Sequence, residues 1–283
     1  MKLGRRIARR LVRTVRRATR NLGTKVRIVQ SYRGLRRAPW SAIRYVLFDR
    51  ELTNFTYEIG NLGELAAALG SALDVPPASI ASFVDELALD THLSAELAIR
   101  LASRRDRNRR MPFGRRLGWY AIVRVRKPRL VVETGVHDGL GSIAILLALQ
   151  RNALEGIDGR LVSMDVNDQS GWLIPERLRG RLEARIGRSL DVIPEVPRTS
   201  SVDIFIHDSD HRYEYELDEL RAVRELAAPA IVYVSDNAHA TTALRDFATD
   251  EGLAFTFWKE EPVGHFFDGA GIGLALRKSP EAA

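Results

Sequence analysis

The chain has 283 residues, enough for one large domain with additions or for two small domains, and its 45% hydrophobic content is ordinary for a soluble globular protein. Cysteine is absent, which excludes disulfides and thiolate chemistry. No apolar run reaches the roughly 18 residues that a transmembrane helix needs, and no secretory signal is evident, so we expect a cytoplasmic protein.

The net charge of +7 is unevenly distributed along the chain. Residues 1–40 hold fourteen Lys or Arg and no Asp or Glu, whereas the other 243 residues carry 29 basic and 36 acidic side chains. An acidic body argues against a general nucleic-acid-binding protein, so we expect no nucleic-acid partner.

The basic arm, residues 1–40, has a helical pattern with arginines filling the positions between apolar ones. We expect a basic amphipathic helix of the type that lies on anionic membrane surfaces, which would make the protein peripheral to a membrane. Two alternatives stay open: the apolar stripe docks on the protein itself, or the arm is an organellar transit peptide. The stripe consists of Leu3, Ile7, Leu11, Val15, Ala18 and Leu22.

Residues 41–116 read as a helical cap region. Two Ala/Leu-rich stretches with helical spacing are separated by Pro76 and Pro77, and no strand alternation is evident. The run "RRDRNRRMPFGRR", residues 104–116, predicts a solvated basic connector.

From about Trp119 onward, seven short β-rich runs alternate with helical segments. This alternation predicts the α/β class: a Rossmann-like, seven-stranded, mostly parallel sheet in residues 117–283 with helices on it. The last two runs, "LAFTFWK" and "GIGLALR", lack a helix between them, so one C-terminal strand should be antiparallel.

A glycine turn follows the first strand of this region. Gly135, Gly139 and Gly141 in "LVVETGVHDGLGS" lie between a strand and a helix, but their spacing is not that of a dinucleotide pyrophosphate loop. Asp165 ends the second strand, where an acid can accept hydrogen bonds from ribose hydroxyls. The alternatives are an ordinary βα turn and a surface or helix-capping acid.

A cluster of titratable side chains follows the strand "VDIFI". Asp208 ends this strand, and Asp236 and Asn237 end the next one, "AIVYVSDN". Adjacent strands lie about 4.8 Å apart, so these oxygens can converge on one point, and hard oxygen ligands suit Mg²⁺.

Other interpretations of this cluster stay open. Asp208 or Asp210 could cap the following helix, and His207 and His211 could be polar groups satisfied at a strand end. A site made of histidines, including His239, would suit Fe or Zn. We disfavour it because side chains alternate along a strand, so His207 should point away from Asp208.

The segments "ETGVHDGLGS", "MDVN", "GRSLDVIP", "FIHDSDH" and "YVSDN", within about residues 130–240, resemble class I S-adenosylmethionine-dependent methyltransferases. More narrowly, they resemble the divalent-metal-dependent O-methyltransferases of the catechol and caffeoyl-coenzyme A type. The glycine loop is one residue longer before its serine than in catechol-type enzymes. The cofactor residues that the resemblance implies are Glu133, Gly135, Gly139 and Ser142 around the methionine part, Asp165 at the ribose, Ser189 by the adenine, and Asp208.

The resemblance also implies a metal site and a base. Asp208, Asp236 and Asn237 would hold Mg²⁺, which would chelate the acceptor hydroxyl and lower its pKa. His211 stands where catechol-type enzymes have a lysine, and a histidine could take the hydroxyl proton.

We therefore expect metal-assisted O-methylation of a small molecule, a sugar or a glycolipid. One alternative is a same-fold enzyme with another reaction, such as hydroxylation. A second is a membrane- or RNA-associated binding protein with a vestigial cofactor pocket. The sequence identifies neither the acceptor nor the oligomeric state, and a homo-oligomer stays open.

Overall fold

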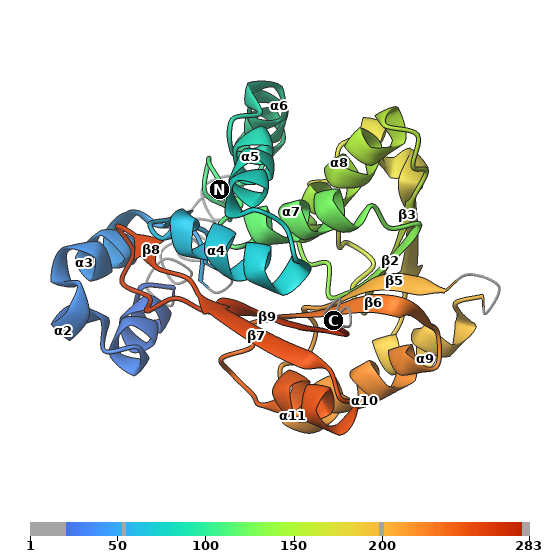
Figure 1. Ribbon diagram of the computed structural model, residues 1–283. Helices are drawn as coiled ribbons and strands as arrows, with labels where there is room; N and C mark the ends of the chain where they lie inside the picture. Colours follow the sequence, from blue (N-terminus) through green and yellow to red (C-terminus); the bar gives the residue numbers. More distant parts are fainter. Residues whose placement is uncertain (1–20, 53–54, 198–200, 279–283) are drawn as a thin grey trace.

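The computed structural model describes residues 21–52, 55–197 and 201–278, so the helix expected over residues 3–22 lies almost wholly outside the described residues. Its centre is a seven-stranded sheet with the order β4-β3-β2-β5-β6-β9-β7 (Figure 1). The strands are β2 (Leu130–Thr134), β3 (Arg160–Asp165), β4 (Leu182–Ile186), β5 (Val202–His207), β6 (Ala227–Asp236), β7 (Ala254–Lys259) and β9 (Gly271–Leu276).

The strands from β4 to β6 run parallel, and β9 runs antiparallel to both of its neighbours, β6 and β7. All six residues of β9 are buried, because it lies inside the sheet and not at its edge. The predicted α/β class, seven strands and antiparallel C-terminal strand are therefore confirmed. The strand order reverses between β2 and β5, which places the usual ligand crevice of such sheets at their carboxyl ends.

Helices cover both faces of the sheet (Figure 1). Between two parallel strands the chain has to return to the end of the sheet at which the first strand began. A tight turn is too short for this, so the connection is usually a helix packed on the sheet. On one side lie α4 (Leu62–Leu73), α5 (Pro77–Ala88), α6 (Thr91–Ala102), α7 (Arg116–Arg126) and α8 (Leu140–Leu154). On the other side lie α9 (Ser189–Val192), α10 (Tyr213–Arg224) and α11 (Ala243–Asp250), and the short 3₁₀ turns are Glu176–Arg181 and Ile193–Glu195.

The helical cap region and the sheet share one apolar cluster. Leu65 and Leu69 of α4 belong to the same buried cluster as Ile122 of α7 and Ile272 of β9. Pro77 begins α5, as the fixed φ of proline favours, so the Pro76-Pro77 pair does separate two helices. The boundary expected between residues 116 and 117 falls at the first residue of α7.

The N-terminal segment packs against the loop that precedes β9. A helix over residues 21–31 is followed by α2 (Gly34–Arg37) and α3 (Pro39–Phe48), and Val29, Ala42 and Tyr45 form a small apolar cluster with Phe266. A two-stranded sheet that the sequence did not predict joins β1 (Glu58–Ile59) to β8 (Pro262–Val263). Strands of two residues are too short to show an alternating pattern. None of the helices described here is long and apolar enough to span a bilayer.

Candidate active site

The glycine turn crosses directly over the end of β5. Gly135 has a φ of 84°, and a Cβ there would lie 2.0 Å from the carbonyl oxygen of Asp208. Gly139, with a φ of 97°, is the N-cap of α8. Both positions need glycine, because an L side chain would be strained at the first and would collide with Ile174 at the second. The turn therefore lies against the strand end that carries the acid and histidine cluster.

Asp165 ends β3, as predicted, and holds this turn in place. Its Oδ2 atom accepts the backbone N–H groups of Val136 and His137, both at 2.9 Å, and its Oδ1 atom accepts that of Asn167 at 2.8 Å. The side chain is half-buried at the carboxyl edge of the sheet. A carboxylate offers about four acceptor positions, so it keeps capacity for a ribose hydroxyl, and this contact stays a prediction.

Glu133, Ser142 and Ser189 lie beneath the surface. Ser142 and Ser163 donate to Oε2 of Glu133 at 2.5 and 2.7 Å. These two hydrogen bonds lower the pKa of Glu133, but burial has the larger effect and raises it to about 7. Ser189 is buried on the face of the sheet that α9 and α10 cover, and its hydroxyl donates to Glu219 of α10. The hydroxyls of Ser142 and Ser189 are thus used inside the protein, and their predicted contacts with the cofactor remain untested.

His207 and Asp208 point in different directions. The His207 ring is fully buried with Nδ1 2.6 Å from Oε2 of Glu219 on α10, which also accepts from Thr134 at 2.9 Å. Burial lowers the pKa of His207, but the hydrogen bond and charge of Glu219 outweigh it, so the pKa is raised. His207 is therefore engaged with α10, as the alternation along β5 led us to expect.

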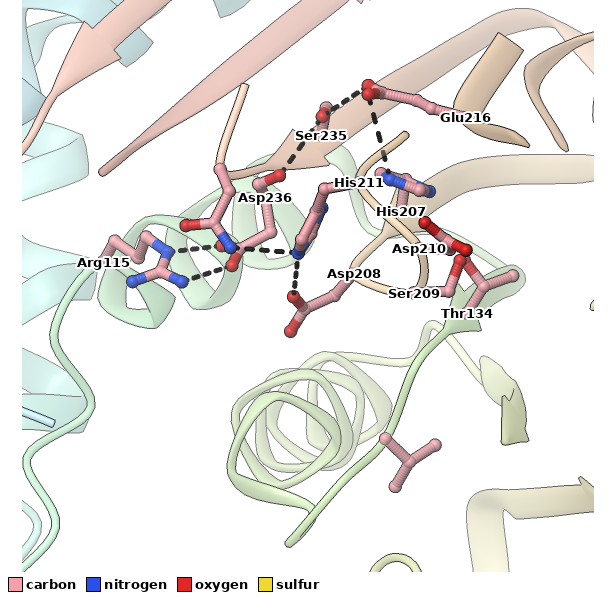
Figure 2. A network of polar contacts seen from close by, with 12 residues as sticks. Arg115, Thr134, His207, Asp208, Ser209, Asp210, His211, Glu216, Ser235 and Asp236 are labelled. Atoms are coloured by element: carbon pink, nitrogen blue, oxygen red, sulfur yellow. Dashed lines mark hydrogen bonds and ion pairs between the residues drawn. The ribbon is translucent and has the colours of Figure 1, made fainter. Parts of the chain in front are cut away.

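Asp236, at the end of β6, is bound by a buried arginine that precedes α7. Arg115 donates from Nε to Oδ1 at 2.6 Å and from Nη2 to Oδ2 (Figure 2). Its Nη1 lies 3.2 Å from Glu260. Such a bidentate pair uses both carboxylate oxygens. Burial would raise the pKa of Asp236, but the charge and hydrogen bonds of Arg115 hold it at about 2.

A second arginine faces Asp208. Nη2 of Arg116 lies 3.7 Å from Oδ2 of Asp208, and burial together with the neighbouring Asp236 raises the pKa of Asp208 well above its usual range. Within the described part of the chain, the buried Nε of Arg116 has no hydrogen-bond partner. Two guanidinium groups thus face two carboxyl groups, and the positive charge at these strand ends comes from the protein.

The metal residues predicted from the sequence lie together, but their oxygens do not form an open cage. Both oxygens of Asp236 are bonded to Arg115, and Nδ2 of Asn237 lies 3.0 Å from Nε2 of His211. Residues 21–52, 55–197 and 201–278 contain no group of three or more His, Asp or Glu side chains that could hold a metal ion. As arranged here, Asp208, Asp236 and Asn237 do not fit a magnesium site.

A cavity of about 420 Å³ opens beside these strand ends. His211 lies in its wall, and burial, followed by the charge of His207, lowers the pKa of His211, so the ring is neutral at pH 7. The polar part of the wall consists of Arg115, His211, Asn237 and His239, and the aromatic part of Tyr32, Phe55, Tyr57 and Phe267. Tyr57 also donates to Glu260, which ties the aromatic part to the Arg115 ion pair.

The expectation that residues 104–116 form a solvated connector holds for exposed Arg105, Arg109 and Arg110 but is wrong for Arg107, Arg115 and Arg116. Arg107 forms two hydrogen bonds to Asp138 of the glycine turn, at 2.6 and 2.9 Å, and Arg115 and Arg116 are each only 6% exposed. The physical reason is that the strand-end acids need cations, and this run supplies them across the site. A signal was present in the sequence: Arg115 and Arg116 lead directly into the apolar start of a helix, where a solvated connector is not expected.

A family model described as "Methyltransferase domain" matches residues 132–238, the segment that contains the glycine turn, Asp165 and His211. Residues 132–238 thus form a methyltransferase domain. This finding favours methyl transfer over hydroxylation or a purely binding role. No match was found among curated proteins.

Two solved structures are similar to the methyltransferase. The O-methyltransferase from Bacillus cereus in complex with SAH has a TM-score of 0.51 and 16% identity, covering 70% of this chain and 96% of that one. The O-methyltransferase TomG from Streptomyces achromogenes, involved in tomaymycin synthesis and in complex with SAM, has a TM-score of 0.46 and 18% identity, covering 86% and 98%. At such identities the first likeness shows the class I methyltransferase fold.

Replacing Arg115 tests how much the methyltransferase depends on this buried pair. Arg115→Met leaves the carboxylates of Asp236 and Glu260 buried without their cation, so we expect it to lower the free energy of unfolding by about 3–5 kcal/mol. Adding Asp236→Asn should recover part of the loss, because it removes one uncompensated charge. Urea denaturation measures both. The control is Arg110→Met, since Arg110 forms only an exposed pair with Glu58. A loss no larger than in the control would contradict the role assigned to Arg115.

Proposed function

We propose that the methyltransferase transfers a methyl group from S-adenosylmethionine to a hydroxyl oxygen of a molecule bound in the 420 Å³ cavity, with His211 as the proton acceptor. The observation that carries this proposal is the position of His211. Its ring is neutral and lies in the cavity wall, 3.7 Å from the strand-end acid Asp208. A neutral imidazole at a ligand cavity is the side chain best suited to remove a hydroxyl proton near pH 7.

Three features of the chain support binding of the cofactor. The glycine turn lies at the carboxyl ends of the strands beside the reversal of strand order, Asp165 offers a carboxylate at the second strand end, and Arg116 offers a buried donor without a partner among the described residues. That donor suits the carboxylate of the cofactor, and the carboxyl group of Asp208 suits its ammonium group. When bound, S-adenosylmethionine supplies the electrophilic methyl group.

Removing either charged contact should weaken cofactor binding. We expect Asp165→Ala and Arg116→Met each to lower the affinity for S-adenosylmethionine by about 1.5–3 kcal/mol, the range for hydrogen bonds to charged groups. Calorimetric titration measures it, and thermal unfolding checks that each variant folds. Asp168→Ala is the matched control, because Asp168 is an exposed acid three residues away. An unchanged affinity in one variant would remove that residue from the cofactor site.

The surroundings of His211 suit a base. Nε2 lies 3.0 Å from the amide of Asn237, which orients the ring, and 3.7 Å from Asp208, which would lie beside the imidazolium after proton transfer. Arg115 lines the same cavity and stays charged, because the charges of Asp236 and Glu260 outweigh the effect of burial and raise its pKa.

The base role predicts a pH-dependent defect. We expect His211→Ala to reduce the rate of S-adenosylhomocysteine formation by about 10²–10⁴, the usual contribution of a general base. The defect should shrink at high pH, where the hydroxyl ionises without help. In the wild type the rate should fall only below about pH 6.5, because a lowered pKa keeps the ring neutral down to its ordinary value. His92→Ala, which changes an exposed histidine of α6, should match the wild type. A pH-independent defect would argue against proton transfer.

Metal assistance, which the resemblance to catechol-type enzymes implies, is tested separately. Because Arg115 occupies both oxygens of Asp236, we expect turnover to persist in excess chelator and titration with Mg²⁺ to release no heat of binding. Loss of turnover in chelator, with recovery on adding Mg²⁺, would instead support the metal-assisted reaction. In that case Arg115 would have to leave Asp236 before the metal could bind.

The lining of the cavity indicates what kind of acceptor it takes. Four aromatic rings line the cavity together with the polar side chains of His211, His239, Asn237 and Arg115, so the acceptor should have an apolar or stacking face beside its hydroxyl. A small aromatic molecule, a sugar or the sugar of a glycolipid has such a face.

A further inference from the structure

The outer face of α3 is apolar and exposed. Trp40, Leu47 and Phe48 are 82%, 60% and 75% exposed, and Ile43 on the same side is 43% exposed. The opposite side of the helix carries Ala42 and Tyr45, which are buried. A helix that only covers a core needs one apolar side, and α3 has two.

Exposed apolar side chains are concentrated in this part of the molecule. Of the sixteen large hydrophobic side chains that are exposed among the described residues, eight lie between Leu22 and Phe48. Figure 1 shows α2 and α3 at one end of the molecule, beyond β8. Soluble monomers rarely expose such concentrations unless the surface binds something.

The charge around this face identifies the kind of partner. Residues 1–48 contain no Asp or Glu, and Arg27, Arg33, Arg36 and Arg44 are exposed in the described part of this segment. Arg44 lies on the same side of α3 as Trp40 and Leu47, by helical spacing. The surface therefore combines apolar anchors with cations and favours a partner that is both apolar and anionic.

We infer that the outer face of α3, formed by Trp40, Ile43, Leu47 and Phe48, rests on a lipid bilayer that carries anionic headgroups. A bilayer offers an apolar layer to the Leu, Ile and Phe side chains, an interface that suits tryptophan, and negative charge for the arginines. The membrane contact expected for residues 1–40 is thereby extended to a defined helix face that runs from Trp40 to Phe48.

The same segment forms a wall of the acceptor cavity. Ile28, Ser31, Tyr32, Leu52 and Phe55 line it together with His211 and Asn237. Docking through α3 therefore brings this wall close to the lipid surface. The acceptor, which rests on the proposed function, is then an amphiphile whose hydroxyl reaches His211 while its apolar part stays at the membrane.

The docking face is tested with the full chain and vesicles, without cofactor or acceptor. We expect wild type to sediment with phosphatidylglycerol/phosphatidylcholine vesicles in a salt-sensitive way and not with pure phosphatidylcholine. The variant Leu47→Glu/Phe48→Glu should bind at least about 100-fold more weakly, because two buried apolar anchors are lost and two negative charges face the lipid. The matched control is Leu89→Glu/Ile99→Glu, two residues that are 73% and 75% exposed elsewhere on the surface; it should bind like wild type.

A second readout follows Trp40 itself. Its fluorescence should shift to the blue on vesicle binding, and Trp40→Phe should remove that shift. Wild-type sedimentation that ignores anionic lipid, or equal binding by wild type and Leu47→Glu/Phe48→Glu, would overturn the inference. A lipid-free dimer of the wild type that this variant abolishes would also overturn it, by showing that a second copy covers the face. Calorimetry with S-adenosylmethionine separates the two proposals: vesicle binding without cofactor binding would refute the proposed function alone.

Discussion

The buried ion pair between Arg115 and Asp236 is the interaction on which the site depends. It joins the start of α7 to the end of β6, and through Glu260 it reaches Tyr57 in the segment before α4. Glu260 also accepts the backbone N–H of Ala270 just before β9. Buried charges are tolerated only when they are closely matched, so these elements are held in one arrangement by a few hydrogen bonds.

This pair also sets the electrostatics of the neighbouring groups. Arg115 lowers the pKa of Asp236, and the ionised Asp236 together with burial raises that of Asp208. The pKa of His211 is lowered, because burial and the charge of His207 outweigh the charges of Asp236 and Glu216. Two carboxyl groups and one histidine at the same strand ends thus titrate in different ranges, which is typical of sites where protons are moved.

The two sides of the N-terminal segment have different surroundings. Its inner side forms the aromatic wall of the cavity, and the outer side of α3 is apolar and flanked by arginines. In the proposed reaction the strand ends of the sheet hold the cofactor, so additions to the sheet have to build the acceptor site. Here the addition that shapes the acceptor cavity is also the part of the described surface that is best suited to lipid.

The sequence by itself determined the sheet and the positions of its strand-end residues. Gly135, Asp165, Asp208 and Asp236 each lie directly after a β-rich run, and the carboxyl ends of parallel strands meet at one edge, so their proximity follows from local pattern and topology alone. What the tertiary structure decided is how their charges are balanced. Arg115 is 121 residues from Asp236 in sequence, and no local spacing encodes that contact. For this reason the sequence predicted a solvated connector, whereas the arginines at its end supply the cations of the site. The exposed apolar side of α3 could likewise not be predicted from the sequence. Composition shows that a helix is apolar, but only packing shows which of its sides stays exposed.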